Sequence, residues 1–314
     1  MFNKRLIFVT GKGGVGKTTI SSAMAVAASK LGKKVLLVDV GGDDALAAGF
    51  GKDTIGHTPK EIYSLISAVR VDPRMAVNEY VHTFIKNQFI ANRITRNRLL
   101  DYLATGTPGL REIMTLGKIW LWEQERDAAS DAYHYDLIIV DAPAAGHGLS
   151  FLQVPQVLMD MIGIGPIKSQ TEAVLGLLQH RKKTSLYLVT LPEELPVIET
   201  IQIYKAAAEV LAMPVGWVFI NACHPKAFTT RESLEIKRRL RALRRDASNT
   251  GFLPTVLLSA RIAIGRRVQQ DHYVKRLKES IKAQFVEIPF RRSDVVAVCY
   301  LEEMAEELLR SVPT

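Results

Sequence analysis

The chain has 314 residues, of which 47% are hydrophobic and 23% charged, as is typical of a globular protein with a full core. No segment approaches the roughly 18 uncharged apolar residues that a membrane-spanning helix needs, and the apolar run after Lys4 and Arg5 is too short for a secretory signal. We therefore expect a cytoplasmic protein, which could also lie peripherally at a membrane. The net charge of +9 would favour nucleic acid, anionic lipid or acidic partners without specifying one.

Six apolar, β-branched runs predict buried strands. In chain order they are residues 5–10, 33–40, 135–142, 184–191, 215–222 and 285–289. Continuous apolar runs suit a parallel sheet that is covered on both faces. The alanine-rich segment 16–33 lacks proline and has Gly32 near its end, which predicts a helix with a glycine C-terminal cap. Strand, glycine loop, helix and strand form a right-handed crossover unit, so we expect a doubly wound, mostly parallel α/β fold.

Two long segments between these strands are expected to be helical. Residues 58–131 include helical patterns at 75–90 and 110–129, and residues 149–182 follow the third predicted strand. The chain has no internal repeat, low-complexity tract or flexible linker. We therefore expect residues 1–314 to form a single domain with helical subdomain elements.

The segment GKGGVGKTT, residues 11–19, contains the phosphate-loop pattern G-x-x-x-x-G-K-[ST] between a predicted strand and a predicted helix. Its glycines allow backbone N–H groups to converge on phosphate oxygens at the helix N-terminus. Lys17 would neutralise the β and γ phosphates, and Thr18 would offer its hydroxyl to Mg²⁺. The residues expected to contact the nucleotide are Gly11, Lys12, Gly13, Gly14, Val15, Gly16, Lys17, Thr18 and Thr19.

The third predicted strand places Asp141 at the carboxyl edge of the sheet, where its carboxylate could reach Mg²⁺ through water. The following residues, among them Pro143, Gly146 and His147, form a small and flexible segment that could move with the γ phosphate. His147 could sense the nucleotide or only hydrogen-bond a backbone carbonyl. Paired with the phosphate loop, this segment predicts a nucleotide switch.

Several motifs resemble one family of nucleotide switches. The loop with its early Lys12 resembles the deviant Walker A motif of the MinD, ParA and ArsA ATPases. DAPAAGHGLSFLQVP is similar to the switch II signature of the ArsA branch, which contains arsenite-pump and tail-anchored-protein targeting ATPases. The likeness continues in GTPGLREI, VFINA and VEIPFRRSDVVAVCYLEEMAEEL, so it covers nearly the whole chain. It implies an ATP hydrolase that uses ATP and Mg²⁺.

The resemblance also implies roles for single residues. Asn221 matches an adenine-reading asparagine, and Pro289 and Phe290 would lie near the base. An amide can pair with both the donor and the acceptor edge of adenine, although it could instead cap the next turn. Lys12 would cross to the nucleotide of a second subunit in a face-to-face dimer, unless it is a solvated loop lysine. With a single phosphate loop, the partner would be another copy or a paralogue.

The sequence departs from the family at the first switch. The family's water-activating aspartate, in a segment resembling DPAHNLSD, falls on Gly41. Asp39 could still serve the switch or Mg²⁺, and Asp43 or Asp44 could swing inward. We therefore expect hydrolysis that is slow or needs a partner chain. The CxxC of zinc-bridged dimers is missing, and two distant cysteines do not form an arsenite site.

Two surfaces could hold a partner. Val154, Val157, Leu158, Met161 and Ile162 have helical spacing and could line an apolar groove or pack in the core. Residues 231–245 and 261–282 predict basic helices, which could be solvated or bind an acidic partner, anionic membrane or DNA.

We expect an ATPase whose nucleotide state controls binding of a hydrophobic or membrane-associated protein. The alternatives are a weakly hydrolysing regulatory or scaffolding subunit paired with a paralogue, and a MinD- or ParA-like positioning ATPase on membrane or DNA.

Overall fold

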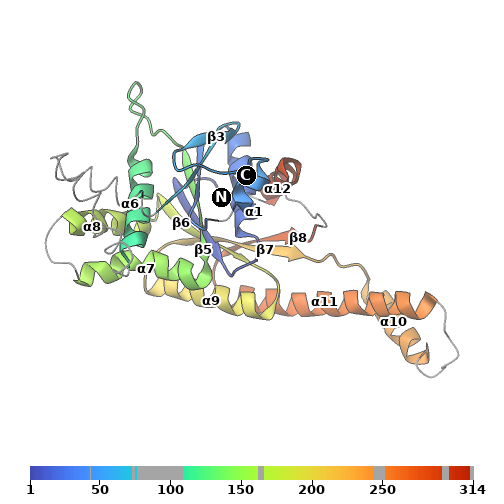
Figure 1. The fold of residues 1–314 in the computed structure, drawn as a ribbon. Coiled ribbons are helices and arrows are strands. Elements are labelled where there is room, and N and C mark those ends of the chain that lie inside the picture. Colours follow the sequence, from blue (N-terminus) through green and yellow to red (C-terminus); the bar gives the residue numbers. More distant parts are fainter. Residues whose placement is uncertain are drawn as a thin grey trace.

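A central sheet organises the molecule. The computed structural model describes residues 1–42, 44–72, 75, 109–161, 166–243, 252–291 and 297–311. Its strands are β1 (Leu6–Gly11), β2 (Val35–Asp39), β3 (Lys60–Tyr63), β4 (Ile66–Arg70), β5 (Leu137–Ala144), β6 (Thr184–Thr190), β7 (Val215–Cys223) and β8 (Gln284–Pro289). Within the described part of the chain they form an eight-stranded sheet of order β3-β4-β2-β5-β1-β6-β7-β8, in which all neighbours except β3 and β4 are parallel (Figure 1).

The six predicted strands correspond to β1, β2, β5, β6, β7 and β8, which confirms the doubly wound α/β fold. The expectation that residues 58–131 are helical was wrong for residues 60–70, where β3 and β4 form. These strands are short, and Lys60 and Glu61 of β3 are exposed, so no continuous apolar run marks β3. β4 is more apolar and adds in parallel to β2, from Val35 opposite Ile66 to Asp39 opposite Arg70.

Helices cover both faces of the sheet (Figure 1). They are α1 (Lys17–Lys30), α2 (Ala45–Gly49), α6 (Leu110–Gln124), α7 (Ala145–Met161), α8 (Pro166–Gln179), α9 (Glu194–Glu209), α10 (Thr230–Leu243), α11 (Phe252–Ser280) and α12 (Val298–Ser311). One apolar cluster packs α1 and α12 on the sheet, and a second packs α6 to α9 and part of α11 on it. The predicted helix at 75–90 lies outside the described residues apart from Met75.

The first helix, α1, is almost entirely enclosed. Its sequence is rich in alanine and serine, and residues 20–29 are all buried. As expected, it ends on a glycine: the Gly32 N–H donates to Ser29 O, and Gly32 has φ 78°. α12 lies against α1, buries Leu301, Met304, Ala305 and Leu308, and is joined to it by the ion pair of Lys30 and Glu306.

Helices α6, α7 and α8 pack together on one face of the sheet, over β5, β1 and β6 (Figure 1). α7 and α8 lie within the segment 149–182 that was expected to be helical, apart from the start of α7. The apolar stripe in α7 divides between two environments: Leu158 is buried, Val154 packs against the core, and Val157 is 52% exposed. The side chain of Met161 and all of Ile162 lie outside the described residues. None of the helices described is both long and apolar enough to cross a membrane.

Candidate nucleotide site

The phosphate loop lies at the carboxyl end of β1, in the middle of the sheet. β1 pairs with β5 on one side and with β6 on the other, and the chain crosses from one half of the sheet to the other at this point. In open α/β sheets such a switch point places ligands outside the carboxyl ends of the strands. Residues that end β2, β5, β7 and β8 therefore surround the same loop.

Two glycines of the loop make approaches that a side chain would block. A Cβ on Gly11 would lie 2.1 Å from the backbone oxygen of Val189, and one on Gly16 would lie 2.4 Å from Nδ2 of Asn221. Gly16 also has φ 92°, in the left-handed region that favours glycine. No side chain caps α1 after Gly16, so the first-turn N–H groups of the helix are left for an anion at this N-terminus.

Thr18 and Asp141 form a compact polar pair beside the loop. The Thr18 hydroxyl donates to Oδ2 of Asp141 at 2.6 Å, and the Ser21 hydroxyl donates to Oδ1 at 3.1 Å. Asp141 is 5% exposed, and this burial raises the pKa of its carboxyl to about 6, although both hydroxyls oppose the shift. A buried carboxylate beside a hydroxyl fits Mg²⁺, which prefers oxygen ligands and keeps several waters.

Asp39 has two different partners on its two oxygens. Oδ2 accepts a hydrogen bond from Nε of Arg70 at 2.8 Å, and Oδ1 accepts one from the Gly42 N–H at 3.1 Å. Arg70 also donates from Nη2 to Asp44 at 2.9 Å. Asp39 is 2% exposed and lies opposite Asp141 in the register of β2 and β5. The Asp39 carboxylate is therefore neutralised by an arginine of the neighbouring strand; Asp43 lies outside the described residues.

The early lysine of the loop has a partner in its own chain. Lys12 Nζ lies 2.6 Å from Oε1 of Glu199 on α9, and the two side chains are 31% and 35% exposed. Lys17 Nζ donates to the backbone oxygen of Lys12 at 3.2 Å. Lys12 is thus held as an ion pair at the edge of the site.

Asn221 supports the phosphate loop directly. Its Nδ2 donates to the backbone oxygen of Val15 at 2.9 Å, and its Oδ1 accepts the N–H of Ala222 at 2.9 Å. Ala222 has φ 56°, an uncommon value for a residue with a side chain. In this arrangement the amide connects the end of β7 to the loop, and it also makes the local turn contact that was the alternative to reading adenine.

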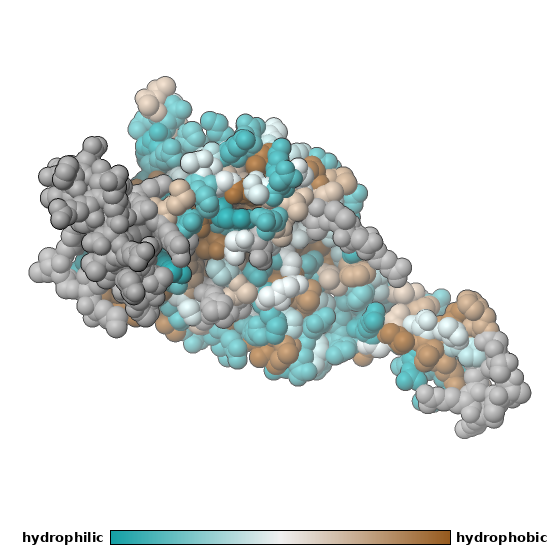
Figure 2. Space-filling model, viewed as in Figure 1, coloured by the Kyte–Doolittle hydropathy of each residue, from teal (hydrophilic) through white to brown (hydrophobic). Residues whose placement is uncertain are grey.

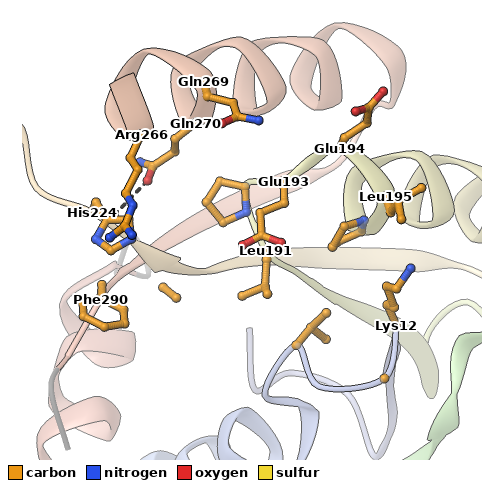
Figure 3. A pocket seen from close by; sticks show the side chains of 15 residues that line it. Lys12, Leu191, Glu193, Glu194, Leu195, His224, Arg266, Gln269, Gln270 and Phe290 are labelled. Carbon is orange, nitrogen blue, oxygen red and sulfur yellow. Dashed lines mark hydrogen bonds between the residues drawn. The ribbon is translucent and has the colours of Figure 1, made fainter. Parts of the chain in front are cut away.

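A pocket of about 820 Å³ extends from the phosphate loop along β6 and β7 to α11 (Figure 3). Lys12 lies at one end, and the rings of His224 and Phe290 lie at the other with centroids 4.7 Å apart. Oε1 of Gln270 accepts the His224 N–H at 2.8 Å, while Nε2 of Gln270 is buried without a hydrogen-bond partner. This pocket therefore combines two rings with an amide donor, and its volume suits a small-molecule ligand.

The segment expected to form the second switch is part of a strand and a helix, and not a flexible loop. β5 continues through Pro143, whose backbone oxygen accepts the Thr10 hydroxyl at 3.1 Å. Gly146 and His147 then lie in the first turn of α7, and nothing is described of the His147 side chain. These residues have regular secondary structure because β5 leads directly into α7.

The sequence also matches the model of a known protein family. The model of the ArsA family, described as anion-transporting ATPase, matches residues 4–310. The chain belongs to this ArsA ATPase family.

Individual members of the ArsA family match over shorter stretches. ATPase BagA of Mycobacterium tuberculosis is 35% identical over 225 residues, which are 69% of this chain and 64% of that protein. ATPase GET3 of Mycosarcoma maydis is 29% identical over 182 residues, 54% of this chain and 50% of that protein. ATPase get3 of Schizosaccharomyces pombe is 31% identical over 182 residues, 54% of this chain and 51% of that protein. The chain therefore spans less than two thirds of these curated relatives.

For this ArsA-family chain, the structure brings most of the predicted site residues to one sheet edge. Lys12, Gly13, Val15 and Phe290 line the pocket, and Thr18 and Asp141 contact each other beside it. Pro289 ends β8 next to Cys223 of β7.

The sequence reading missed four residues of this ArsA-family site, namely Arg70, Glu199, His224 and Gln270. None of them belongs to a short motif. Arg70, Glu199 and Gln270 reach the site from elements that are distant in sequence from the phosphate loop, and His224 directly follows β7. A histidine two positions after the Asn221-Ala222 pair was the one available signal for His224.

Proposed function

We propose that this chain is a Mg²⁺-dependent, nucleotide-switched ATPase. The observation that carries the proposal is the 2.6 Å hydrogen bond from the Thr18 hydroxyl to Asp141, next to an uncapped helix N-terminus. Mg²⁺, when bound, would offset phosphate charge and polarise the phosphoryl group. The hydroxyl of Thr18 would then ligate the ion, and Asp141 would hold one of its waters.

The phosphates would lie on the loop between Gly11 and Thr19. The N–H groups of the first turn of α1 would donate to them, and Lys17 would leave the backbone oxygen of Lys12, where it now donates at 3.2 Å, to neutralise charge. The close approaches at Gly11 and Gly16 support this assignment, since they require glycine at the two positions where the phosphate-loop pattern has it.

The base would lie in the pocket between β7 and α11. His224 and Phe290 offer faces for stacking, and Gln270 Nε2 is a buried donor without a partner. Asn221 would contribute to base binding only if its Nδ2 exchanged the hydrogen bond to Val15 O for one to the base. The pocket volume of about 820 Å³ accommodates a nucleoside.

We propose that hydrolysis by the isolated chain is slow. Asp39 is the buried carboxylate closest in sequence to the missing switch carboxylate, but both of its oxygens have donors, and one donor is the Arg70 cation. A carboxylate whose two oxygens already accept hydrogen bonds has to give one of them up before it can take a proton from water. Gly41 contributes no carboxyl group.

We propose that two ATP-bound chains meet face to face, with Lys12 released from Glu199 to reach the partner's phosphate, and that this step changes affinity for a hydrophobic or membrane-associated protein. The exposure of Lys12 and Glu199, 31% and 35%, supports such an exchange because a partly exposed ion pair costs little to break. The partner could be a second copy or a paralogue.

The test is nucleotide binding by the purified full chain with and without Mg²⁺. Thr18→Ala and Asp141→Asn should reduce ATP affinity in Mg²⁺ by tenfold or more while leaving affinity in a chelator nearly unchanged, because both residues act through the ion. Ser185→Ala removes a buried hydroxyl remote from the loop and is the matched control. Equal losses with and without Mg²⁺ would contradict the assigned metal role.

A second candidate function is a regulatory subunit that binds ATP but hydrolyses it only with a paralogue. The Asp39–Arg70 ion pair favours this second function, because it engages Asp39, the buried carboxylate closest in sequence to the missing switch carboxylate. Single-turnover hydrolysis separates the two proposals: turnover by the pure chain that rises with its concentration supports a homodimeric ATPase. No turnover at any concentration, with ATP bound, supports the regulatory subunit.

A further inference from the structure

A helical hairpin projects from the body on the side of β7 and α9 (Figure 1). It consists of α10, residues 230–243, and the first half of α11, residues 252–265, and we call it the projecting hairpin. The second half of α11 packs on α9, while the first half packs on α10. The 29 residues of α11 make a helix about 44 Å long, so its beginning lies far from the sheet.

The first half of α11 is predominantly apolar. Its sequence FLPTVLLSARIAIG contains one charge, Arg261, in 14 residues. Leu257 and Ile264 are buried against α10, but the other large apolar side chains are exposed. The exposed apolar residues of the projecting hairpin are Leu234, Phe252, Leu253, Val256, Leu258 and Ile262, with Phe252 82% exposed. A helix with this many exposed large apolar side chains ordinarily requires an apolar cover.

The other helix of the hairpin is strongly cationic. α10 carries five basic side chains and two acidic ones: Arg231, Lys237, Arg238, Arg239 and Arg241 against Glu232 and Glu235. Arg238 and Arg239 pair with Glu235, both at exposed positions. Figure 2 shows hydrophobic and hydrophilic residues side by side over this part of the molecule. Exposed apolar side chains and cations thus occupy one projecting element.

We propose that the projecting hairpin binds the surface of an anionic lipid bilayer. Phe252, Leu253 and neighbouring apolar residues would enter the interface between headgroups and acyl chains, and the cations of α10 would contact lipid phosphates. The apolar segment is about 21 Å long, shorter than the roughly 30 Å hydrocarbon core, so it would lie in the interface and not span the membrane.

The charges favour a membrane over the other occupants. Pairing of two hairpins from two copies would bring two cationic α10 helices together, which is unfavourable. Nucleic acid would satisfy the cations but would leave the apolar helix exposed, and Phe252 is the one aromatic side chain of the described hairpin. An anionic membrane covers the apolar residues and neutralises the cations in one contact.

The experiment is co-sedimentation of the full chain, without nucleotide, with vesicles of phosphatidylcholine alone or containing about 30% phosphatidylglycerol. We expect binding to the anionic vesicles, weak binding to the neutral ones, and a decline in binding as salt rises. Lys237→Gln with Arg241→Gln should lower anionic-vesicle affinity more than tenfold, since each cation near the surface contributes about fivefold. Phe252→Ser with Leu253→Ser should lower it at least as much.

The matched control is Leu31→Ser with Val210→Ser, which changes two comparably exposed apolar residues, 55% and 59%, outside the hairpin. This control should bind vesicles like the unmodified chain. Circular dichroism melting of each variant establishes that the fold is retained.

Three results would overturn the proposal: absence of binding to anionic vesicles by the folded chain, equal weakening by the control, or a lipid-free dimer that the hairpin substitutions dissociate. Retention on DNA that exceeds binding to anionic vesicles at equal salt would also overturn it. Because no nucleotide is present, these outcomes leave the proposed ATPase function to its own test.

Discussion

Lys12 Nζ lies 2.6 Å from Oε1 of Glu199, 187 positions later in the same chain. The lysine that the family resemblance assigns to a partner's nucleotide therefore already has a partner within its own subunit. In the proposed face-to-face dimer Lys12 leaves Glu199, so this ion pair would oppose that assembly by the free energy needed to break it.

Glu199→Gln should strengthen dimerisation that depends on nucleotide. Removing the carboxylate frees Lys12, and because the pair is about one third exposed, the gain should be modest, about two- to fivefold in the dimer dissociation constant. Sedimentation velocity with Mg²⁺ and a non-hydrolysable ATP analogue measures it. Glu209→Gln, at the other end of α9, makes the same change in charge and should have no effect. Weaker dimerisation of Glu199→Gln would show that Glu199 acts in the dimer instead of opposing it.

Arg70→Gln should destabilise the fold. The substitution leaves Asp39, 2% exposed, without its cation, and loss of one member of a buried pair costs about 3 kcal/mol or more. The double variant Asp39→Asn with Arg70→Gln should recover much of that loss, since no buried charge remains. Urea unfolding at pH 7 compares the variants. If Arg70→Gln is as stable as the unmodified chain, the ion pair of Asp39 and Arg70 does not stabilise the fold.

Asn221→Ala should weaken binding of phosphate as well as of the base. It removes the hydrogen bond to Val15 O and leaves the loop less well positioned, at about 1 kcal/mol for a lost hydrogen bond. Affinity for tripolyphosphate, which has no base, should therefore fall about fivefold, and affinity for ATP should fall further. Isothermal titration calorimetry measures both ligands. Unchanged affinity for tripolyphosphate would restrict Asn221 to the base.

The unfolding free energy should carry a pH signature of Asp141. Burial raises the pKa of this carboxyl from 3.8 to about 6, so between these values the folded chain holds a proton that the unfolded chain has lost. Its contribution to stability is thus present at low pH and is lost as pH rises through about 6. Without Mg²⁺ and nucleotide, the stability of the unmodified chain relative to Asp141→Asn should fall by about 1 to 2 kcal/mol between pH 5 and 7.5. A difference that is constant across this range would contradict the raised pKa.

The parts of the fold that local sequence determines were predictable. Buried parallel strands require continuous apolar runs, and the phosphate loop requires glycines at fixed spacing, so β1, β2 and residues 11–19 could be located from sequence. β3 could not, because an edge strand of four residues with an exposed start, Lys60 and Glu61, has no distinctive pattern.

Partners in the site were harder to predict than its motifs. Arg70 ends β4 and reaches Asp39 only because β4 adds next to β2, so its role depends on a strand pairing that was not foreseen. Glu199 and Gln270 are single polar positions on long helices, and their contacts depend on how α9 and α11 pack. A sequence motif identifies the ligand chemistry, whereas the side chains that restrain the motif come from tertiary packing.

The contact between α12 and α1 has a consequence for synthesis on the ribosome. Lys30 and Glu306 are 276 positions apart, yet α12 supplies much of the apolar cover of the helix that begins at the phosphate loop. A nascent chain therefore displays the alanine-rich surface of α1 until α12 has emerged, although every residue of the phosphate loop was made long before. A product terminated before α12 would contain the complete phosphate loop but would lack the apolar cover of α1, the helix that follows this loop. The first part of the site to be synthesised therefore depends on the last helix of the described chain.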